Sequence, residues 1–168
     1  MGVLDRAVRR TDYNSMQDRE MQKRGSTLGR CQQCGVCAEI CPSGRHGGID
    51  CLSIMHRASV GTLDAAEEST IWLCTVCLSC SEQCPSNAGP AEVIALLREE
   101  AAQSGNLPKH FREEAKRYLQ TGSCFPHTGM TRKMRRQLGL EDAAPSKEAV
   151  EEAREIARRT GLGGLDLD

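Results

Sequence analysis

The sequence predicts an all-α fold from three observations. Several segments repeat apolar residues at the three- and four-residue spacing of an amphipathic helix, and no useful stretch alternates as a strand would. Ten cysteines among 168 residues include two equally spaced runs, Cys31 to Cys41 and Cys74 to Cys84, between helical segments. Aromatic residues make up only 3% of the chain. We therefore expect metal ligation to supply part of the folding free energy.

The length of the chain predicts one compact domain with extensions. Residues 1–29 are polar with a weak helical pattern, and they are expected to form an N-terminal helical extension. Residues 30–107 contain both cysteine runs and form the predicted central domain. Residues 108–168 are predicted to be a C-terminal helical extension.

The segment between the runs predicts a loop and two helices. Residues 43–48 are rich in glycine and predict the loop. The next helix should end at Gly61, and its apolar face consists of Cys51, Ile54, Met55 and Ala58. Asp64 is the expected N-cap of a short helix that leads to the second run.

Four further helices are predicted after the second run. The first has Pro90 in its opening turn, ends at Gly105, and carries the apolar stripe Val93, Ile94, Leu97 and Ala101. The second begins near Pro108 and ends at Gly122, with Phe111, Ala115, Tyr118 and Leu119 on one face. The last two have the apolar faces Met130, Met134 and Leu138, and Val150, Ala153 and Ala157, and Gly161 is expected to close the final helix.

Each cysteine run has the C-x2-C-x2-C-x3-C-P spacing of proteins that hold two [4Fe-4S] clusters. Three thiolates at this spacing can bind three iron corners of a cubane, and the fourth cysteine of each run ligates the other cluster. The spacing assigns one cluster to Cys31, Cys34, Cys37 and Cys84. It assigns the second cluster to Cys74, Cys77, Cys80 and Cys41.

Structural zinc is the alternative for these cysteines, but zinc sites usually pair two C-x2-C hooks. Here each hook has a third cysteine in step and a fourth followed by proline, which favours iron-sulfur clusters. An all-cysteine cubane has no open iron site. The sequence therefore predicts single-electron transfer and no catalytic residue in this chain.

The remaining cysteines, charges and termini point to no other site. Cys51 is predicted to be a small buried apolar residue, and Cys124 has no matched spacing. The basic patch Arg132 to Arg136 lacks the interleaved aromatics of single-strand nucleic-acid binding. No apolar leader or membrane-length span occurs, so we expect a cytoplasmic protein in which the cysteines bind metal.

The sequence resembles the HdrC family, whose members are the small two-cluster subunits of the soluble heterodisulfide reductase of methanogens and their relatives. Three segments carry the resemblance: CQQCGVCAEICPSGR from Cys31, IWLCTVCLSCSEQCP from Ile71, and PAEVIALLREEA from Pro90. It continues through residues 108–122 and RRQLGL near Leu140. The glycine-rich loop after Pro42 departs from the family pattern.

The resemblance implies an α-helical ferredoxin with two [4Fe-4S] clusters that is a non-catalytic subunit of an oxidoreductase complex. In such complexes the electrons come from a subunit that contains flavin and Fe-S clusters, which we call the flavin subunit. The two-cluster subunit receives them and acts as a relay. The acceptor is a catalytic subunit, which reduces the CoM-S-S-CoB heterodisulfide on clusters held by CCG motifs. A larger assembly adds a hydrogenase or formate dehydrogenase. This chain has no adjacent cysteine pair, which agrees with a relay role.

Three alternatives stay open at this point. One is the equivalent subunit of a sulfur-oxidising heterodisulfide-reductase-like complex. Another is the iron-sulfur subunit of a quinone-linked dehydrogenase, although such subunits usually carry a [2Fe-2S] domain upstream and only thirty residues precede Cys31. The third, from a different class, is a zinc-stabilised interaction module without redox function.

Overall fold

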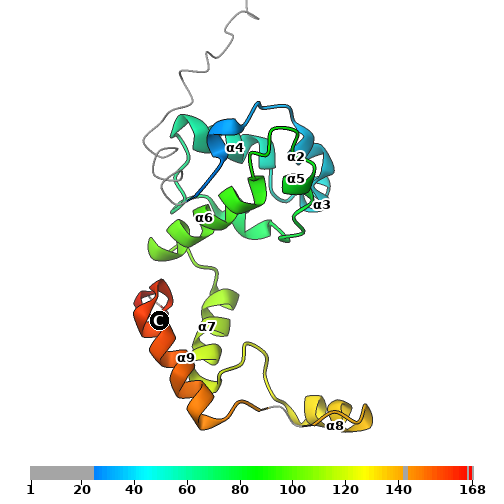
Figure 1. Ribbon diagram of the computed structural model, residues 1–168, viewed down its shortest axis with the longest axis vertical. Helices are drawn as coiled ribbons and strands as arrows, with labels where there is room; N and C mark the ends of the chain where they lie inside the picture. The colour runs from blue at the N-terminus through cyan, green and yellow to red at the C-terminus, as the bar shows by residue number, and fades with distance from the viewer. Residues whose placement is uncertain (1–24, 142–143, 166, 168) are drawn as a thin grey trace, which may run out of the picture. The chain divides into compact units, whose positions relative to one another are not determined.

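The computed structural model of the chain describes residues 25–141, 144–165 and 167 (Figure 1). These residues form helices joined by loops and include no strand, so the predicted all-α class is confirmed. Most of the predicted N-terminal extension, residues 1–24, lies outside the described residues. The chain divides between Asn106 and Leu107 into two compact units.

The first unit contains both cysteine runs, and its helices are short except for two. Its 3-10 helices are η2 (Leu28–Arg30) and η3 (Ser69–Leu73), and its α-helices are α2 (Val36–Ile40), α3 (Pro42–Arg45), α4 (Cys51–Val60), α5 (Ser79–Glu82) and α6 (Pro90–Gln103). The long helices α4 and α6 pack against each other and supply much of the core. The cysteine runs therefore lie against a helical pair.

Helices α4 and α6 match the sequence prediction. The Asp50 carboxylate caps α4 by accepting from the amide of Ser53 at 3.0 Å, and Gly61 ends the helix with a φ of 73°. Pro90 occupies the first turn of α6. The predicted apolar faces are buried in both helices and consist of Cys51, Ile54, Met55 and Ala58, and of Val93, Ile94, Leu97 and Ala101.

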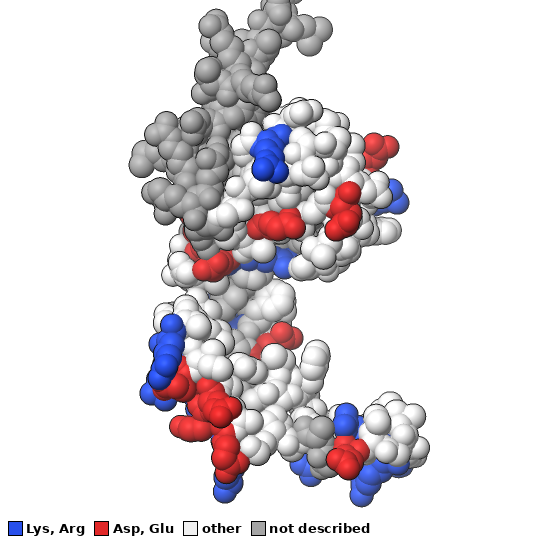
Figure 2. All heavy atoms as spheres, viewed as in Figure 1, with Lys and Arg blue, Asp and Glu red and all other residues white. Residues whose placement is uncertain are grey.

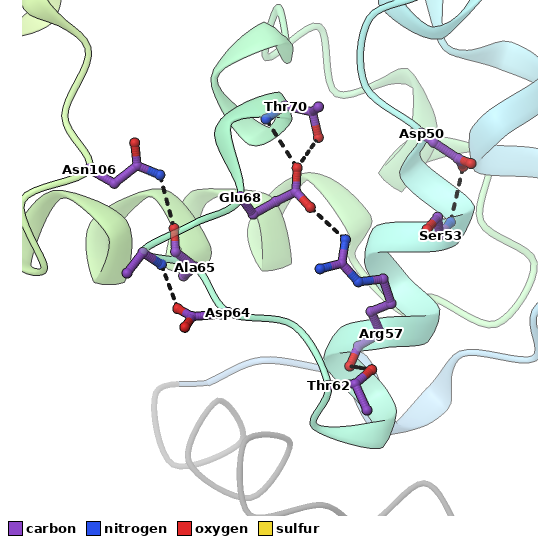
Figure 3. Close-up of polar contacts among 10 residues, drawn as sticks. Asp50, Ser53, Arg57, Thr62, Asp64, Ala65, Glu68, Thr70 and Asn106 are labelled. Atoms are coloured by element: carbon purple, nitrogen blue, oxygen red, sulfur yellow. Dashed lines mark hydrogen bonds and ion pairs between the residues drawn. The ribbon is translucent and has the colours of Figure 1, made fainter.

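The predicted helix start at Asp64 is wrong. Its carboxylate accepts from the amide of Ala66 at 2.9 Å and closes only a turn (Figure 3). Glu68 caps η3 instead, because it accepts from the amide of Thr70 at 3.1 Å while Arg57 of α4 donates to it at 2.5 Å. The ion pair between Arg57 and Glu68 therefore fixes the N-cap at Glu68, four residues after the expected cap at Asp64.

The glycine-rich segment after the first run is only partly a loop. Residues Pro42–Arg45 form α3, and the loop follows it. Proline at the first helical position presets φ, and the sulfur of Cys41 accepts from the amide of Gly44 at 3.3 Å. The thiol of Cys41 thus caps a helical turn that begins at Pro42. The glycine content of the segment had predicted a loop there instead.

The second unit contains α7 (Lys109–Thr121), α8 (Gly129–Gln137), α9 (Lys147–Arg159) and the 3-10 helix η4 (Gly161–Gly164). All three predicted α-helices are present, but the last ends at Arg159, and Gly161 begins η4 instead of closing the helix. Helix α7 packs on α9, where Arg154 donates to the carbonyl oxygen of Leu119 at 2.7 Å. In Figure 2 acidic side chains gather along the middle of α9 and basic side chains lie at its two ends, and Glu151 and Glu155 pair with arginines of the same helix.

The apolar face predicted on α8 exists but is exposed within this unit. The exposed fractions of Met130, Met134 and Leu138 are 67%, 52% and 72%. No helix in the described ranges is long and apolar enough to cross a membrane.

Candidate metal centre

The two cysteine runs enter the site in the same way. Each follows a 3-10 helix, and the residue three places before the first cysteine, Leu28 or Ile71, is fully buried. The amide of Cys31 donates to the carbonyl oxygen of Leu28 at 2.9 Å, and that of Cys74 to Ile71 at 3.3 Å. Each run is therefore anchored to the core immediately before its first thiol.

The same two backbone reversals follow in both runs. Gln33 and Gly35 have φ values of 56° and 84°, and Val76 and Leu78, at the equivalent places, have values of 53° and 63°. A left-handed conformation costs a non-glycine residue roughly 1–2 kcal/mol. Such residues persist only where the surrounding structure determines the backbone. The repetition of this conformation indicates that the backbone of both loops is set by the geometry of the ligand loop and not by the conformational preference of each residue.

Short helices bring the two runs together. Cys37 lies on α2 and Cys80 on α5, both thiols are buried, and the two helices pack against each other. Each fourth cysteine is then followed by a proline, Pro42 or Pro85. The contact between α2 and α5 therefore joins the interior ends of both ligand loops.

Five of the predicted ligands line one pocket. The pocket has about 310 Å³ of empty space, part of which is open solvent, and its apolar lining includes Leu52 and Pro90. Cys31, Cys34, Cys37 and Cys84 form one predicted set, and Cys80 belongs to the other. Cys84 belongs to the opposite run, so the structure brings together one complete set that the spacing assigned to a single cluster.

The other predicted set is less enclosed. Cys41 and Cys80 are buried, Cys74 is half-buried and Cys77 is exposed. Between the two buried thiols lies Cys51, which is only 1% exposed. Hydrogen bonding to Cys80, with burial adding to it, raises the pKa of Cys51, and donation from Cys51 lowers the pKa of Cys80.

The burial predicted for Cys51 is confirmed, but its contact with two candidate ligands was not foreseen. Cys51 matches no ligand spacing, and its place at the start of α4 gave it the appearance of an ordinary core residue. Only the packing of α4 against the two runs brings it to the site.

Sulfur atoms of both predicted sets accept hydrogen bonds from the chain. The backbone amide of Gly44 donates to the sulfur of Cys41 at 3.3 Å. In the same way the amide of Val76 donates to Cys74 at 3.4 Å, and the amide of Ala88 donates to Cys84 at 3.3 Å. The side-chain amide of Gln33 donates to Cys31 at 3.3 Å. Donors of this kind stabilise negative charge on sulfur and tune cluster potentials. The residues therefore fit an anionic thiolate-bound cluster.

The thiol pKa values reflect two opposed influences. Burial raises the pKa of Cys31, and it raises that of Cys37 to about 11. For Cys84, burial is the largest single influence and raises the pKa, but hydrogen bonds from Ser86 and Ala88 outweigh it and the pKa is lowered. A hydrogen bond with Ser79 lowers the pKa of exposed Cys77. Because each ligand must lose its proton to bind iron, metal binding compensates for the burial of these thiols.

Two polar side chains that the sequence analysis did not single out hold the second run. Arg98 of α6 donates to the carbonyl oxygens of Ile71 at 2.9 Å and Cys74 at 2.6 Å, and its guanidinium lies 5.5 Å from the centre of the Trp72 ring. The hydroxyl of Ser43 donates to the carbonyl oxygen of Leu73 at 2.7 Å and links the two runs. Arg98 is the one basic residue in the sequence of α6, a signal that could have identified it.

The remaining cysteine, Cys124, is exposed in the loop after α7. Among the described residues, no group of three or more His, Cys, Asp or Glu side chains is arranged to hold a single metal ion.

The fold and the cysteine runs define an all-α iron-sulfur protein. A family model described as a 4Fe-4S dicluster domain matches residues 26–88, which include both runs. The chain carries two [4Fe-4S] clusters, and the zinc alternative is set aside. It belongs to the HdrC family, the small iron-sulfur subunits of heterodisulfide reductases.

Three relatives document this membership. The subunit designated C in the H(2):CoB-CoM heterodisulfide,ferredoxin reductase of Methanothermobacter marburgensis is 34% identical over 84% of this chain and 79% of its own length. The subunit designated C2 in the H(2)/formate:CoB-CoM heterodisulfide,ferredoxin reductase of Methanococcus maripaludis is 33% identical over 82% and 77%. The corresponding subunit of the ferredoxin:CoB-CoM heterodisulfide reductase of Methanosarcina mazei is 31% identical over 74% and 78%.

Proposed function

We propose that this protein is the electron-transfer subunit of a cytoplasmic heterodisulfide reductase complex. It passes single electrons from the flavin subunit, which contains flavin and Fe-S clusters, to the catalytic subunit. The catalytic subunit carries CCG motifs and reduces the CoM-S-S-CoB heterodisulfide. The observation that carries the proposal is the packing of α2 on α5, which joins two ligand loops of the same backbone in one compact unit. Two clusters held this close together form a relay.

The ligand sets are part of the proposal. Cys31, Cys34, Cys37 and Cys84 hold one cluster, and Cys74, Cys77, Cys80 and Cys41 hold the other. The shared pocket of the first set supports this crossing. The contact of Cys51 with both Cys41 and Cys80 supports the second set, because these two thiols come from different runs.

The chain holds, insulates and tunes its clusters but performs no bond chemistry. A [4Fe-4S] cluster with four thiolate ligands supplies single-electron transfer. Buried Cys37 and Cys80 limit the access of water to the interior side of the loops. The amides that donate to sulfur stabilise the added charge after reduction. Because the chain has no adjacent cysteine pair, heterodisulfide cleavage is assigned to the catalytic subunit.

The electron source is also proposed from relatives. The names of two relatives include hydrogen, and one of these also includes formate, as reductants. A hydrogenase or formate dehydrogenase is therefore the expected origin of electrons in a larger assembly that contains the flavin subunit.

The test is reconstitution under anaerobic conditions. The purified chain should contain about eight irons and show the electron paramagnetic resonance of two reduced [4Fe-4S] clusters. The flavin subunit, once reduced, should reduce the catalytic subunit only when this chain is present. A Cys37→Ala variant, which removes a proposed ligand, should abolish that dependence. Equal reduction of the catalytic subunit without the chain would contradict the proposal.

A further inference from the structure

The two ligand loops share a backbone but differ in side chains. Where the second loop has Leu73, Val76 and Leu78, the first has Arg30, Gln33 and Gly35 at the equivalent places. The three apolar side chains are exposed by 51%, 55% and 47%. We call Leu73, Val76 and Leu78 the second-run face.

Packing among the described residues does not account for the second-run face. Half-exposed side chains gain little from burial in the core, and Val76 and Leu78 lie in the left-handed region, which disfavours both and especially the β-branched valine. The first loop adopts the same conformation with Gln33 and Gly35, so neither apolar residue is needed to form a ligand loop. Their presence is explained by a contact outside the described part of the chain.

The second-run face belongs to the loop that carries three candidate ligands of one cluster. Cys77 stands between Val76 and Leu78 in the chain and is exposed. No residue from Ser69 to Ser81 is charged, although this segment surrounds a site for an anionic cluster. Such a surface can be desolvated without stripping water from ions.

We propose that the second-run face is the docking surface for the partner subunit that exchanges electrons with the cluster assigned to Cys74, Cys77, Cys80 and Cys41. This inference rests on the proposed function and names which ligand loop faces that partner. The partner presents an uncharged apolar surface above its own one-electron redox centre. Contact through Val76 and Leu78 brings that surface onto Cys77, where the described chain covers the ligands least.

The position of the face selects this occupant over others. A contact made only for oligomerisation or membrane attachment has no reason to lie on a ligand loop, and the exposed apolar residues of α8 would serve it without backbone strain. A redox partner must come close to a cluster, and an apolar contact excludes water between the two centres.

The test converts the second loop to the chemistry of the first. The holoprotein variant Val76→Gln/Leu78→Gly should fold, because glycine relieves the left-handed position that leucine occupies. Its cluster content, its resonance signals and its Tm are compared with those of the wild type. A control variant, Met130→Gln/Leu138→Gln, removes the same number of exposed apolar side chains from α8.

Binding is measured for the purified flavin subunit and the purified catalytic subunit in turn. We expect the loop variant to keep both clusters and to bind one of the two subunits roughly 10- to 100-fold more weakly, with a matching loss of electron transfer, while the control binds as the wild type does. If the loop variant loses a cluster, Leu73→Gln carries the test, because Leu73 does not have a positive φ.

Three results would overturn the docking surface. The first is that the loop variant and Leu73→Gln bind both subunits as tightly as the wild type does. The second is that the wild type forms a dimer that the loop variant dissociates. The third is that the wild type binds phospholipid vesicles through this face. If wild-type electron transfer occurs and only the loop dependence is absent, the proposed function stands and the docking surface falls. If the wild type neither binds nor transfers electrons, both fall.

Discussion

Arg98 donates a hydrogen bond of 2.6 Å to the backbone oxygen of Cys74. The bond fastens α6 to the backbone of the first cysteine of the second run, and the same guanidinium lies over Trp72. A helix that belongs to the core thus fixes the backbone of a ligand loop and places a positive charge beside it.

Substitution of Arg98 by Met should destabilise the protein and shift one cluster potential. Removal of the donor leaves two carbonyl oxygens without it and should lower the free energy of unfolding by about 1–3 kcal/mol. Loss of the positive charge disfavours the reduced cluster of the second run, so its potential should become more negative. Denaturant unfolding and a redox titration followed by electron paramagnetic resonance measure the two effects.

Arg98→Lys separates the two contributions. Lysine retains the charge but not the planar fork, so the stability loss should remain while the potential moves less. Equal potentials in the wild type and Arg98→Met would show that the charge does not act on the cluster.

Replacement of Cys41 by Ala should remove the cluster whose other ligands are Cys74, Cys77 and Cys80. The crossed ligand sets predict this loss, although Cys41 lies in the first run. Resonance spectra and iron content of Cys41→Ala, compared with Cys34→Ala, identify which cluster each cysteine holds. Retention of an unchanged second-run signal in Cys41→Ala would reject the crossing.

Gly48→Ala should destabilise the link between the two runs. A Cβ at this position would collide with the Ser43 hydroxyl and lie 2.8 Å from its backbone oxygen, and that hydroxyl holds Leu73 of the other run. Overpacking of this kind costs about 1–3 kcal/mol. Thermal unfolding and cluster occupancy should both fall, whereas Gly129→Ala, where a Cβ meets nothing within 4 Å, should change neither.

Glu68→Gln should reveal a pH-dependent part of the stability. Burial is the largest influence on the pKa of Glu68 and raises it, but hydrogen bonds from Thr70 and Arg57 outweigh it and lower the pKa below 4.5 (Figure 3). A lowered carboxyl pKa stabilises the fold above the unfolded pKa and loses this effect as pH falls through the folded value. The variant should be less stable by about 1 kcal/mol near pH 7.

The difference between wild type and Glu68→Gln should shrink as pH drops below 4.5. Denaturant unfolding of both proteins at each pH measures it, because acid loss of clusters affects the two alike. A difference that stays constant below pH 4.5 would contradict the assignment of the lowered pKa to Glu68.

Periodicity predicted the helices because most of them bury a stripe that local spacing defines. The apolar faces of α4 and α6 are of this kind, and their helix ends carry the glycine or proline that marks them. The sequence predicted the helix start at Asp64, but Glu68 is the residue that caps the helix. Glu68 is held in place by Arg57 from another helix. A single-sequence pattern contains no such long-range pair.

Ligand spacing predicted the composition of the site but not its surroundings. The number of cysteines and their steps identify two cubane clusters, whereas the ligand pairing stays a prediction. The contact of Cys51 with Cys80 and the bond from Ser43 to Leu73 depend on how distant segments pack. The exposure of Val76 and Leu78 is likewise a property of the fold, since an apolar residue between cysteines suggests burial.

The shared pocket of Cys31 and Cys84 also determines when the protein can be finished during its synthesis. The ribosome delivers the thiols of the first run early, but the pocket gains its last sulfur only after α4, η3 and α5 have been translated, and its wall at Pro90 comes later still. With the proposed crossed ligand set, a nascent chain therefore holds three thiols of one cluster before the fourth ligand, Cys84, has been made. We therefore expect cluster insertion to be a late event, in which iron and sulfide reach a nearly completed polypeptide whose early cysteines have been kept reduced.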